Sequence, residues 1–245
     1  METSETQDRF SPALISERLS EARREIEVLA NGRPIKLLAV TKTVPVEAIN
    51  YAIDNLGVTA IGENRVQELL SKYELLHTPD SGKLEIHLIG SLQTNKVKYI
   101  IDKVDMIESV DSLKLATEID KQAKKHNLIM DILVEVNIGR EEQKGGVAPE
   151  ELEDFITSLS ACSSVRLRGL MTIAPKCDDP EEYNKYFKEA RDLFEKIRLK
   201  KTTPDLAAHF DVLSMGMSSS FRQAIKQGST EIRLGSTIFG ARTYN

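Results

Sequence analysis

The sequence predicts a single (β/α)8 TIM barrel, and three observations lead to this fold class. Short apolar runs typical of buried strands alternate with amphipathic helical patterns, which indicates a parallel sheet covered by helices. Eight such units can be counted, the number that closes a barrel. The length of 245 residues is close to the ~250 residues usual for one such barrel. An open, doubly wound sheet is the alternative, because counting units does not separate the two architectures.

The expected elements follow in order along the chain. A helix is predicted over 11–30, with Ser11 as its N-cap and Pro12 in its first turn. The eight predicted strands cover 37–41, 58–61, 85–89, 105–108, 130–136, 165–170, 210–214 and 231–234. Each strand except the last precedes a helical pattern, of which 180–200 is the clearest. The segment after the eighth strand is short for a full helix, so the extra N-terminal helix is expected to cover that gap.

Composition narrows the class of protein. No linker or repeat divides the chain, so residues 1–245 are expected to form one domain, with 1–10 flexible. A net charge of −5 and a pI near 5.6 argue against nucleic-acid binding, which needs a basic face. Cys162 and Cys177 have no histidine at ligand spacing, so no metal site and no disulfide framework are expected. No apolar run approaches the ~20 residues that span a bilayer, and the polar start is unlike a signal peptide. A soluble, cytoplasmic protein is therefore expected.

The loops after strands seven and eight carry the first functional signal. A barrel places its chemistry at the C-terminal ends of its strands. There the sequence has "SMGMSSS" and "LGSTIFG", which combine small hydroxyl residues with backbone N–H groups that can bind an anion. The pair predicts a phosphate site where barrels often hold one. The alternative is that Ser218 to Ser220 only cap the next helix.

Lys42 is the second signal, because it follows the apolar run of strand one directly. Opposite a phosphate site, its amine suits a Schiff base with a phosphorylated aldehyde or ketone. Partial burial would lower the pKa of the amine and make it nucleophilic. A solvated surface lysine is the alternative, since exposed lysines are common. Arg233, within strand eight, is expected to face into the barrel, where it approaches a ligand ring nitrogen or pairs with a carboxylate.

Six ordered motifs resemble one family. Over about residues 35–243 the chain is similar to the pyridoxal 5′-phosphate homeostasis proteins, the YggS/PROSC-type family, in "LLAVTKT", "IGENRVQE", "HLIGSLQTNKVK", "GLMTIAP", "LSMGMS" and "RLGSTIFGAR". The resemblance implies a barrel like the alanine racemase N-terminal domain, with pyridoxal 5′-phosphate bound as an internal aldimine to Lys42. It implies further cofactor-binding residues: Ser214, Gly216, Gly235 and Ser236 for the phosphate, Arg233 for the pyridine nitrogen, and Asn64, His87 and Met171 for the lining.

Three positions depart from the common family pattern. The family often has an acidic residue where Ser220 stands, which leaves the role of that position open here. Ser236 stands where threonine is common, and it keeps the hydroxyl. Gly145, in "EEQKGGV", stands where serine or another small residue is common. None of these changes involves the lysine, so cofactor binding is still expected.

The resemblance implies a carrier without robust catalysis, so no catalytic residue is expected. A racemase needs two acid/base groups, one on each face of the cofactor. In alanine racemases the second is a tyrosine reached through a partner subunit, with a further β domain that this chain has no room for. The expected protein is a monomer that holds pyridoxal phosphate, serves vitamin B6 and amino-acid balance, and passes the cofactor to apo-enzymes. The alternatives are a weak pyridoxal-phosphate enzyme, such as a racemase, and a Schiff-base aldolase without this cofactor.

Overall fold

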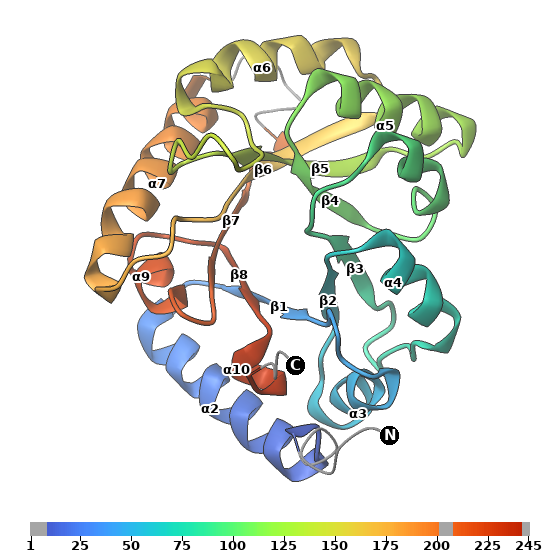
Figure 1. Ribbon diagram of the computed structural model, residues 1–245, viewed down its shortest axis with the longest axis vertical. Helices are drawn as coiled ribbons and strands as arrows, with labels where there is room; N and C mark the ends of the chain where they lie inside the picture. The colour runs from blue at the N-terminus through green and yellow to red at the C-terminus, as the bar shows by residue number, and fades with distance from the viewer. Residues whose placement is uncertain (1–8, 201–207, 242–245) are drawn as a thin grey trace.

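Eight parallel strands form a closed barrel in the computed structural model, which describes residues 9–200 and 208–241. The strands are β1 (Lys36–Val40), β2 (Ala60–Glu63), β3 (Glu85–Leu88), β4 (Met106–Val110), β5 (Met130–Val136), β6 (Val165–Thr172), β7 (Val212–Met217) and β8 (Glu231–Leu234). Each strand pairs with its sequence neighbour, and β8 pairs with β1. Figure 1 shows the ring of strands with the helices outside it. The predicted (β/α)8 barrel is confirmed, and the open sheet is excluded.

Helices and short 3-10 turns cover the outside of the barrel. The helices are α2 (Pro12–Ala30), α3 (Val46–Leu56), α4 (Val66–Lys72), α5 (Leu113–Lys125), α6 (Leu152–Ser158), α7 (Tyr183–Lys200), α9 (Phe221–Lys226) and α10 (Ser236–Phe239). The 3-10 turns are η1 (Tyr73–Leu75), η2 (Thr94–Tyr99), η3 (Pro149–Glu151), η4 (Leu159–Ala161) and η5 (Pro180–Glu182). Their apolar faces pack on the strands to form the main hydrophobic core. Among the described residues, no helix is both long enough and apolar enough to cross a membrane.

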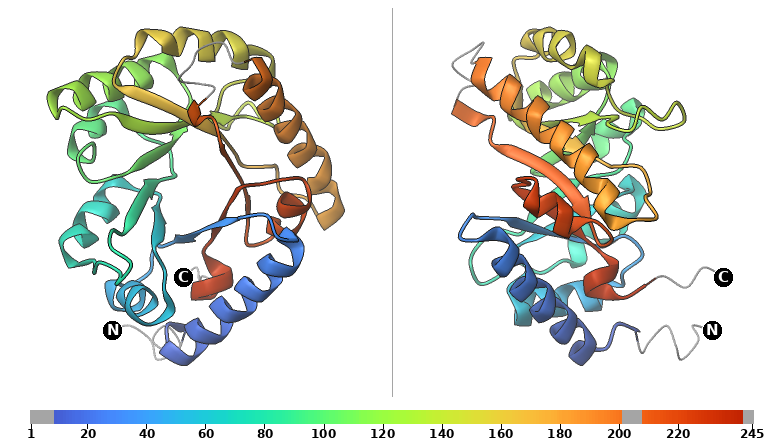
Figure 2. Two further views of the ribbon diagram at one scale, coloured as in Figure 1. Left: turned by 180° about the vertical axis from the view of Figure 1, so that it is seen from behind. Right: turned by 90° about the vertical axis from the view of Figure 1, so that its left-hand side faces the viewer.

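Helix α2 fills the gap that the short last helix leaves, as predicted. It begins at Pro12, and Asn31 ends it in the left-handed conformation at φ 48°. One face is buried: Ile15, Leu19, Ala22, Ile26 and Ala30. This face packs against α9, α10 and α3, so the two ends of the described chain lie side by side (Figures 1 and 2).

The N-terminal ten residues, expected to be flexible, fall partly outside the described part of the chain. Residues 1–8 lie outside it, whereas Arg9 and Phe10 are described. Arg9 Nη1 donates a hydrogen bond to the carbonyl oxygen of Ala241, 2.8 Å away, and Phe10 packs against the core. These contacts tie the start of the described chain to its end.

Strand β7 ends later in the chain than predicted. It was expected over 210–214 but runs to Met217. The register with β8 shifts between Ser214 and Met217, and Gly216 takes φ 97° there, a conformation open to glycine. The irregularity lets the strand continue, so the β7 loop begins three residues later than expected.

Candidate functional site

A cavity of about 600 Å³ opens at the C-terminal ends of the strands. Its described lining is Val40, Lys42, Asn64, Ile89, Ile173, Met217, Ser218, Ser219, Arg233, Gly235, Ser236, Thr237 and Ala241. These residues come from the ends of β1, β2, β3, β6, β7 and β8 or from the loops that follow them. This is the end of a barrel that carries chemistry. Another cavity, of about 520 Å³, lies at the opposite end, beside Lys83, Asp105 and Arg166, and its described lining includes none of the predicted site residues.

Lys42 lies on the cavity, in the turn that follows β1. Its side chain is half-buried. Thr41 is fully buried, and its N–H donates to the Gly62 carbonyl 3.0 Å away, which continues the barrel ladder to the foot of the turn. A primary amine is thus held at the mouth of the barrel by a fixed backbone.

Hydroxyl groups line the part of the cavity that the loops after β7 and β8 form. Ser218, Ser219, Ser236 and Thr237 all line it. The two loops that carry them are joined, because the backbone N–H of Thr237 donates to Ser218 Oγ at 3.2 Å. The close approach of Gly235 to Val40 brings this loop near β1, since a Cβ at Gly235 would lie 3.3 Å from Val40. Four hydroxyl residues beside two cationic side chains suit a phosphate.

Arg233 faces the barrel interior, as predicted, and it also lines the cavity. Its guanidinium is only 3% exposed. Nη1 donates to Ser214 Oγ at 2.5 Å, and Nη2 donates to the carbonyl oxygen of Thr172 at 2.8 Å. A carboxylate oxygen of Glu108 lies 3.8 Å from Nη1. Arg233 therefore lies close to a carboxylate and also faces the cavity in which a ligand could bind, so both roles expected for it remain possible.

Asn64 offers an independent test of whether a polar ligand fits. Its Oδ1 atom is buried, and within the described chain it has no hydrogen-bond partner. Buried polar groups are nearly always hydrogen-bonded, so a ligand hydroxyl or protonated ring group would satisfy this oxygen. The hydroxyl residues, Lys42, Arg233 and Asn64 together fit pyridoxal phosphate, which carries an aldehyde, a phosphate, a ring nitrogen and a phenolic oxygen.

Four predicted site residues do not line the cavity. Met171 and Ser214 are fully buried; Met171 packs in the barrel interior against Met106 and Leu133. Gly216 turns toward the outside, where a Cβ would lie 2.5 Å from the Cβ of Ala224 in α9. His87, also fully buried, lies in the barrel interior, and the structure places it below the lining rather than in it.

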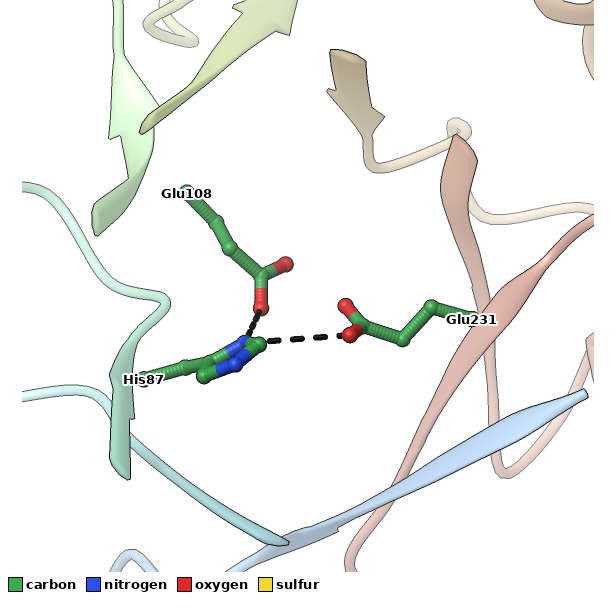
Figure 3. Close-up of side chains that lie close together, drawn as sticks. All are labelled: His87, Glu108 and Glu231. Carbon is green, nitrogen blue, oxygen red and sulfur yellow. Dashed lines mark hydrogen bonds and ion pairs between the residues drawn. The ribbon is translucent and has the colours of Figure 1, made fainter. Parts of the chain in front are cut away.

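His87 belongs to a cluster of buried ionisable groups (Figure 3). Its Nδ1 lies 2.6 Å from Glu108 Oε1 and 3.8 Å from Glu231 Oε2, and its Nε2 lies 2.7 Å from Glu85 Oε1. Burial alone would lower the pKa of His87, but the hydrogen bonds with Glu108 and Glu85 and the charge of Glu231 raise it to about 10. Burial and the neighbouring Glu108 raise the pKa of Glu231 to about 7. The imidazole is therefore a cation at neutral pH.

A continuous hydrogen-bonded path joins His87 to the cavity. Glu108 Oε1 contacts His87, its Oε2 accepts from Ser214 Oγ at 2.7 Å, and Ser214 accepts from Arg233. We call Arg233, Ser214, Glu108 and His87 the interior column. His87, Glu108 and Glu231 bring potential metal-ligand atoms within 4.8 Å of one another. Arg233 and Lys36 already supply positive charge, 3.8 Å from Glu108 and 3.7 Å from Glu231, so the carboxylates are balanced without an ion.

The loop after β7 lines the cavity with Ser218 and Ser219, which belong to the segment predicted to bind an anion. Ser214 and Gly216, which the family resemblance implied for the phosphate, do not line it. The three-residue extension of β7 keeps them within the strand. Ser220, one of the three positions expected to depart from the family pattern, is 2% exposed, and its Oγ accepts a hydrogen bond from the N–H of Met217 at 3.2 Å. Its side chain stabilises the loop and does not line the cavity.

Comparisons with known proteins agree with this geometry. The family model described as "Alanine racemase, N-terminal domain" matches residues 17–243. A pyridoxal phosphate homeostasis protein from Aquifex aeolicus (strain VF5) is 46% identical over 209 residues, which is 85% of this chain and 88% of that protein. One from Escherichia coli (strain K12) is 37% identical over 237 residues, or 94% of this chain and 98% of its own.

A solved structure extends the likeness to three dimensions. PipY of Synechococcus elongatus PCC7942, solved with pyridoxal phosphate bound, is 35% identical and has a TM-score of 0.78. The match covers 92% of this chain and all of PipY, 100%. The chain therefore belongs to the pyridoxal phosphate homeostasis protein family, a group of barrels of the alanine racemase N-terminal type.

Proposed function

We propose that this chain holds pyridoxal 5′-phosphate in the 600 Å³ cavity, joined to Lys42 as a Schiff base, and serves intracellular vitamin B6 and amino-acid homeostasis without robust catalysis. One observation carries the proposal. The cavity brings Lys42, Arg233 and four hydroxyl residues together around a buried, unpartnered Asn64 oxygen. The bound cofactor in PipY supports the same ligand here.

Each group of the cavity has a distinct task in binding. Lys42 would hold the cofactor through its amine, which can condense with an aldehyde with loss of one water molecule. The hydroxyls of Ser218, Ser219 and Ser236 would hydrogen-bond the phosphate. The fixed positive charge of Arg233 would disfavour protonation of a ring nitrogen bound beside it. An unprotonated ring is a weaker electron sink, which is the chemistry that the cofactor supplies when it is bound.

The lining of the cavity favours a carrier over an enzyme. Among the lining residues that the structure describes, Lys42 and Arg233 are the ionisable ones. Racemisation needs a second acid/base group opposite the lysine, and arginine stays protonated at ordinary pH. A site that binds the aldehyde yet moves no second proton would store the cofactor and release it.

One observation favours the second candidate, a weak pyridoxal-phosphate enzyme. Burial and the neighbouring Asp111 raise the pKa of Glu135 to about 7, which suits a general acid or base. Glu135 is on β5, is half-buried, and is not part of the described lining. Incubation with amino acids in deuterated water separates the two candidates. Exchange of the α-proton that disappears in both Lys42→Ala and Glu135→Gln would establish the enzyme, whereas no exchange supports the carrier.

The first experiment is the visible absorption spectrum of the purified protein, before and after borohydride, with the adduct located by peptide mass. We expect a yellow protein that borohydride bleaches and tags at Lys42. A colourless protein that pyridoxal phosphate cannot reconstitute would contradict the proposal. Borohydride trapping only in the presence of a sugar phosphate would instead indicate a Schiff-base aldolase.

The cellular part of the proposal has separate tests. We propose a cytoplasmic monomer that passes its cofactor to apo-enzymes. Sedimentation of the loaded protein tests the monomer, and recovery of activity by an added apo-enzyme tests the transfer. Recovery no faster than with free cofactor at the same released concentration would exclude direct transfer.

A further inference from the structure

Three charged side chains form an ion cluster behind the turn that carries Lys42. Lys72 of α4 lies with its Nζ 2.9 Å from Glu63 Oε1 of β2 and 2.7 Å from Glu68 Oε1 of α4. The Glu63 and Lys72 side chains are 1% and 12% exposed, and burial raises the pKa of Glu63. We call Glu63, Glu68 and Lys72 the wall cluster. Glu63 and Glu68 both come from the "IGENRVQE" motif, and neither lines the cavity.

The wall cluster binds the backbone on both sides of Lys42. Before it, Lys72 Nζ donates to the carbonyl oxygen of Thr41 at 2.8 Å, and Thr41 Oγ1 donates to Glu63 at 2.7 Å. After it, the backbone N–H of Thr43 donates to Glu68. The residues on either side of Lys42 are therefore held by one set of connected charges.

Thr43 shows that this turn needs to be held. Its φ is 60°, in the left-handed region that a β-branched residue rarely adopts. Such backbone conformations persist when the surroundings over-determine them, and they concentrate at functional sites. Here the surrounding bonds are those of the wall cluster, and the residue next to the strained one is Lys42.

We infer that Glu63, Glu68 and Lys72 are positioning residues, which hold the turn so that Lys42 is presented to the cavity for covalent attachment. The inference rests on the proposed function for the identity of the ligand. It assigns no proton transfer to the wall cluster, because the cluster acts through the backbone. Its effect is on the covalent bond at Lys42, and the hydroxyl residues across the cavity bind the phosphate independently of it.

The molecule offers a matched control for this inference. Asp120 and Lys124 form an ion pair of the same i,i+4 spacing on α5, and Asp120 also accepts a hydrogen bond from a backbone N–H, that of Ser164, at 2.7 Å. Neither residue lines the cavity. Lys124→Met therefore removes a comparable ion pair without touching the Lys42 turn.

The first arm of the test needs no cofactor. Amide hydrogen exchange is measured at Thr43 in the apo protein, in Glu68→Ala and in the double variant Glu63→Gln with Lys72→Met. The double variant removes Glu63 and Lys72 together, so the Glu63 carboxylate, 1% exposed, is not left buried without its cation. Glu68, which also loses Lys72, is 19% exposed. We expect exchange at Thr43 to become roughly tenfold faster or more in both variants, and to be unchanged in Lys124→Met. Unchanged exchange at Thr43 in the two variants overturns the inference.

The second arm separates positioning of Lys42 from general damage to the cavity. Affinity is measured for pyridoxal phosphate and for pyridoxamine 5′-phosphate, which has no aldehyde and cannot condense with lysine. In Glu68→Ala we expect retention of pyridoxal phosphate to fall roughly tenfold, with pyridoxamine phosphate bound as before. Equal losses for both ligands overturn the inference.

A rescue completes the design. Glycine adopts φ 60° without strain, so adding Thr43→Gly to Glu68→Ala should recover most of the lost retention. Failure of the rescue contradicts the role assigned to the strained turn. A parent protein that forms no borohydride-trapped adduct would contradict the proposed function, and the exchange arm would still decide whether the wall cluster holds the turn.

Discussion

Two buried ion networks lie on different sides of the barrel wall beside the cavity, and they differ in what they bind. The interior column runs from side chain to side chain inside the barrel and ends on the Arg233 guanidinium. The wall cluster lies between β2 and α4 and ends on the backbone of Thr41 and Thr43. One network thus orients a side chain, and the other fixes a turn.

The two networks also differ in how deeply their charged groups are buried. Glu108 and His87 in the interior column are fully buried, so each charge there relies on its partners for compensation. Glu68 in the wall cluster is 19% exposed, and water can replace part of what it loses. We therefore expect the interior column to govern stability and the wall cluster to govern the geometry of Lys42.

The sharpest way to break this distinction is to remove the central carboxylate of the interior column. Glu108→Ala leaves the His87 and Arg233 cations without their shared anion, so the free energy of unfolding should fall by about 3–5 kcal/mol. Glu68→Ala, in the wall cluster, should lower it by about 1 kcal/mol or less. Urea unfolding of both variants measures this. Equal losses would erase the distinction.

The second prediction concerns pH. The pKa of His87 is raised from 6.5 to about 10 by its carboxylate partners, against the effect of burial. Its stabilisation is complete below pH 6.5 and is lost as pH rises through 10, because over this range the native state holds a proton that the unfolded state has released. The free energy of unfolding should thus fall by about 1.4 kcal/mol per pH unit, or about 2 kcal/mol between pH 7.5 and 9.

His87→Gln tests that assignment directly. The slope of stability against pH above 7.5 should become flatter in the variant. The range is chosen because the raised pKa of Glu231, about 7 through burial, also lowers stability with rising pH, but mainly between about 4.5 and 7. A slope that persists in His87→Gln would assign the titration to another group.

The third prediction cuts the interior column at its link to the cavity. Ser214→Ala removes the hydroxyl that hydrogen-bonds to both Glu108 and Arg233 and should lower the free energy of unfolding by about 1–2 kcal/mol. The absorption maximum of the bound cofactor, and the pH at which it changes, should also shift, because Arg233 is less firmly held. An unchanged spectrum and titration would mean that the interior column supports the fold alone.

The smallest effect is expected at Ser236, which lines the cavity but belongs to neither the interior column nor the wall cluster. Under the proposed function, Ser236→Ala would remove one hydrogen bond from a hydroxyl to the charged phosphate and should weaken cofactor binding by roughly tenfold. Ser160→Ala is the control, since its hydroxyl donates to the carbonyl oxygen of Thr157 and neither residue lines the cavity. It should leave affinity unchanged. Equal affinity of the parent for pyridoxal and pyridoxal phosphate would contradict the phosphate site itself.

Much of the fold could be predicted because the pattern of apolar runs is local. Every predicted strand overlaps an observed one, and the first helix was placed within one residue of its start. The end of β7 could not be predicted, since it depends on a shift of register between two strands. As a result Ser214 lies within the strand, and the loop that lines the cavity includes Ser218 and Ser219.

The residues of the cavity could be predicted where a suitable side chain stands at the C-terminal end of a strand. Lys42, Asn64, Arg233, Gly235 and Ser236 follow or end strands, and the structure brings them to one cavity. His87 also belongs to a strand, and it contacts Glu85 of that same strand and Glu108 of the neighbouring β4. No local pattern reveals the contact with Glu108. The wall cluster was missed for the same reason, because its acids serve the backbone of a segment about twenty residues earlier in the chain.

The pairing of β1 with β8 gives the barrel a seam, at which its first and last strands meet. Lys42 follows one side of this seam and Ser236 follows the other. A molecule joined to the first and hydrogen-bonded to the second is a cross-link between the two ends of the fold. Binding of this molecule would then stabilise the β1–β8 seam against local opening by mass action. Heat or denaturant that loosens α2 and α10 would release the bound molecule before the rest of the barrel unfolds.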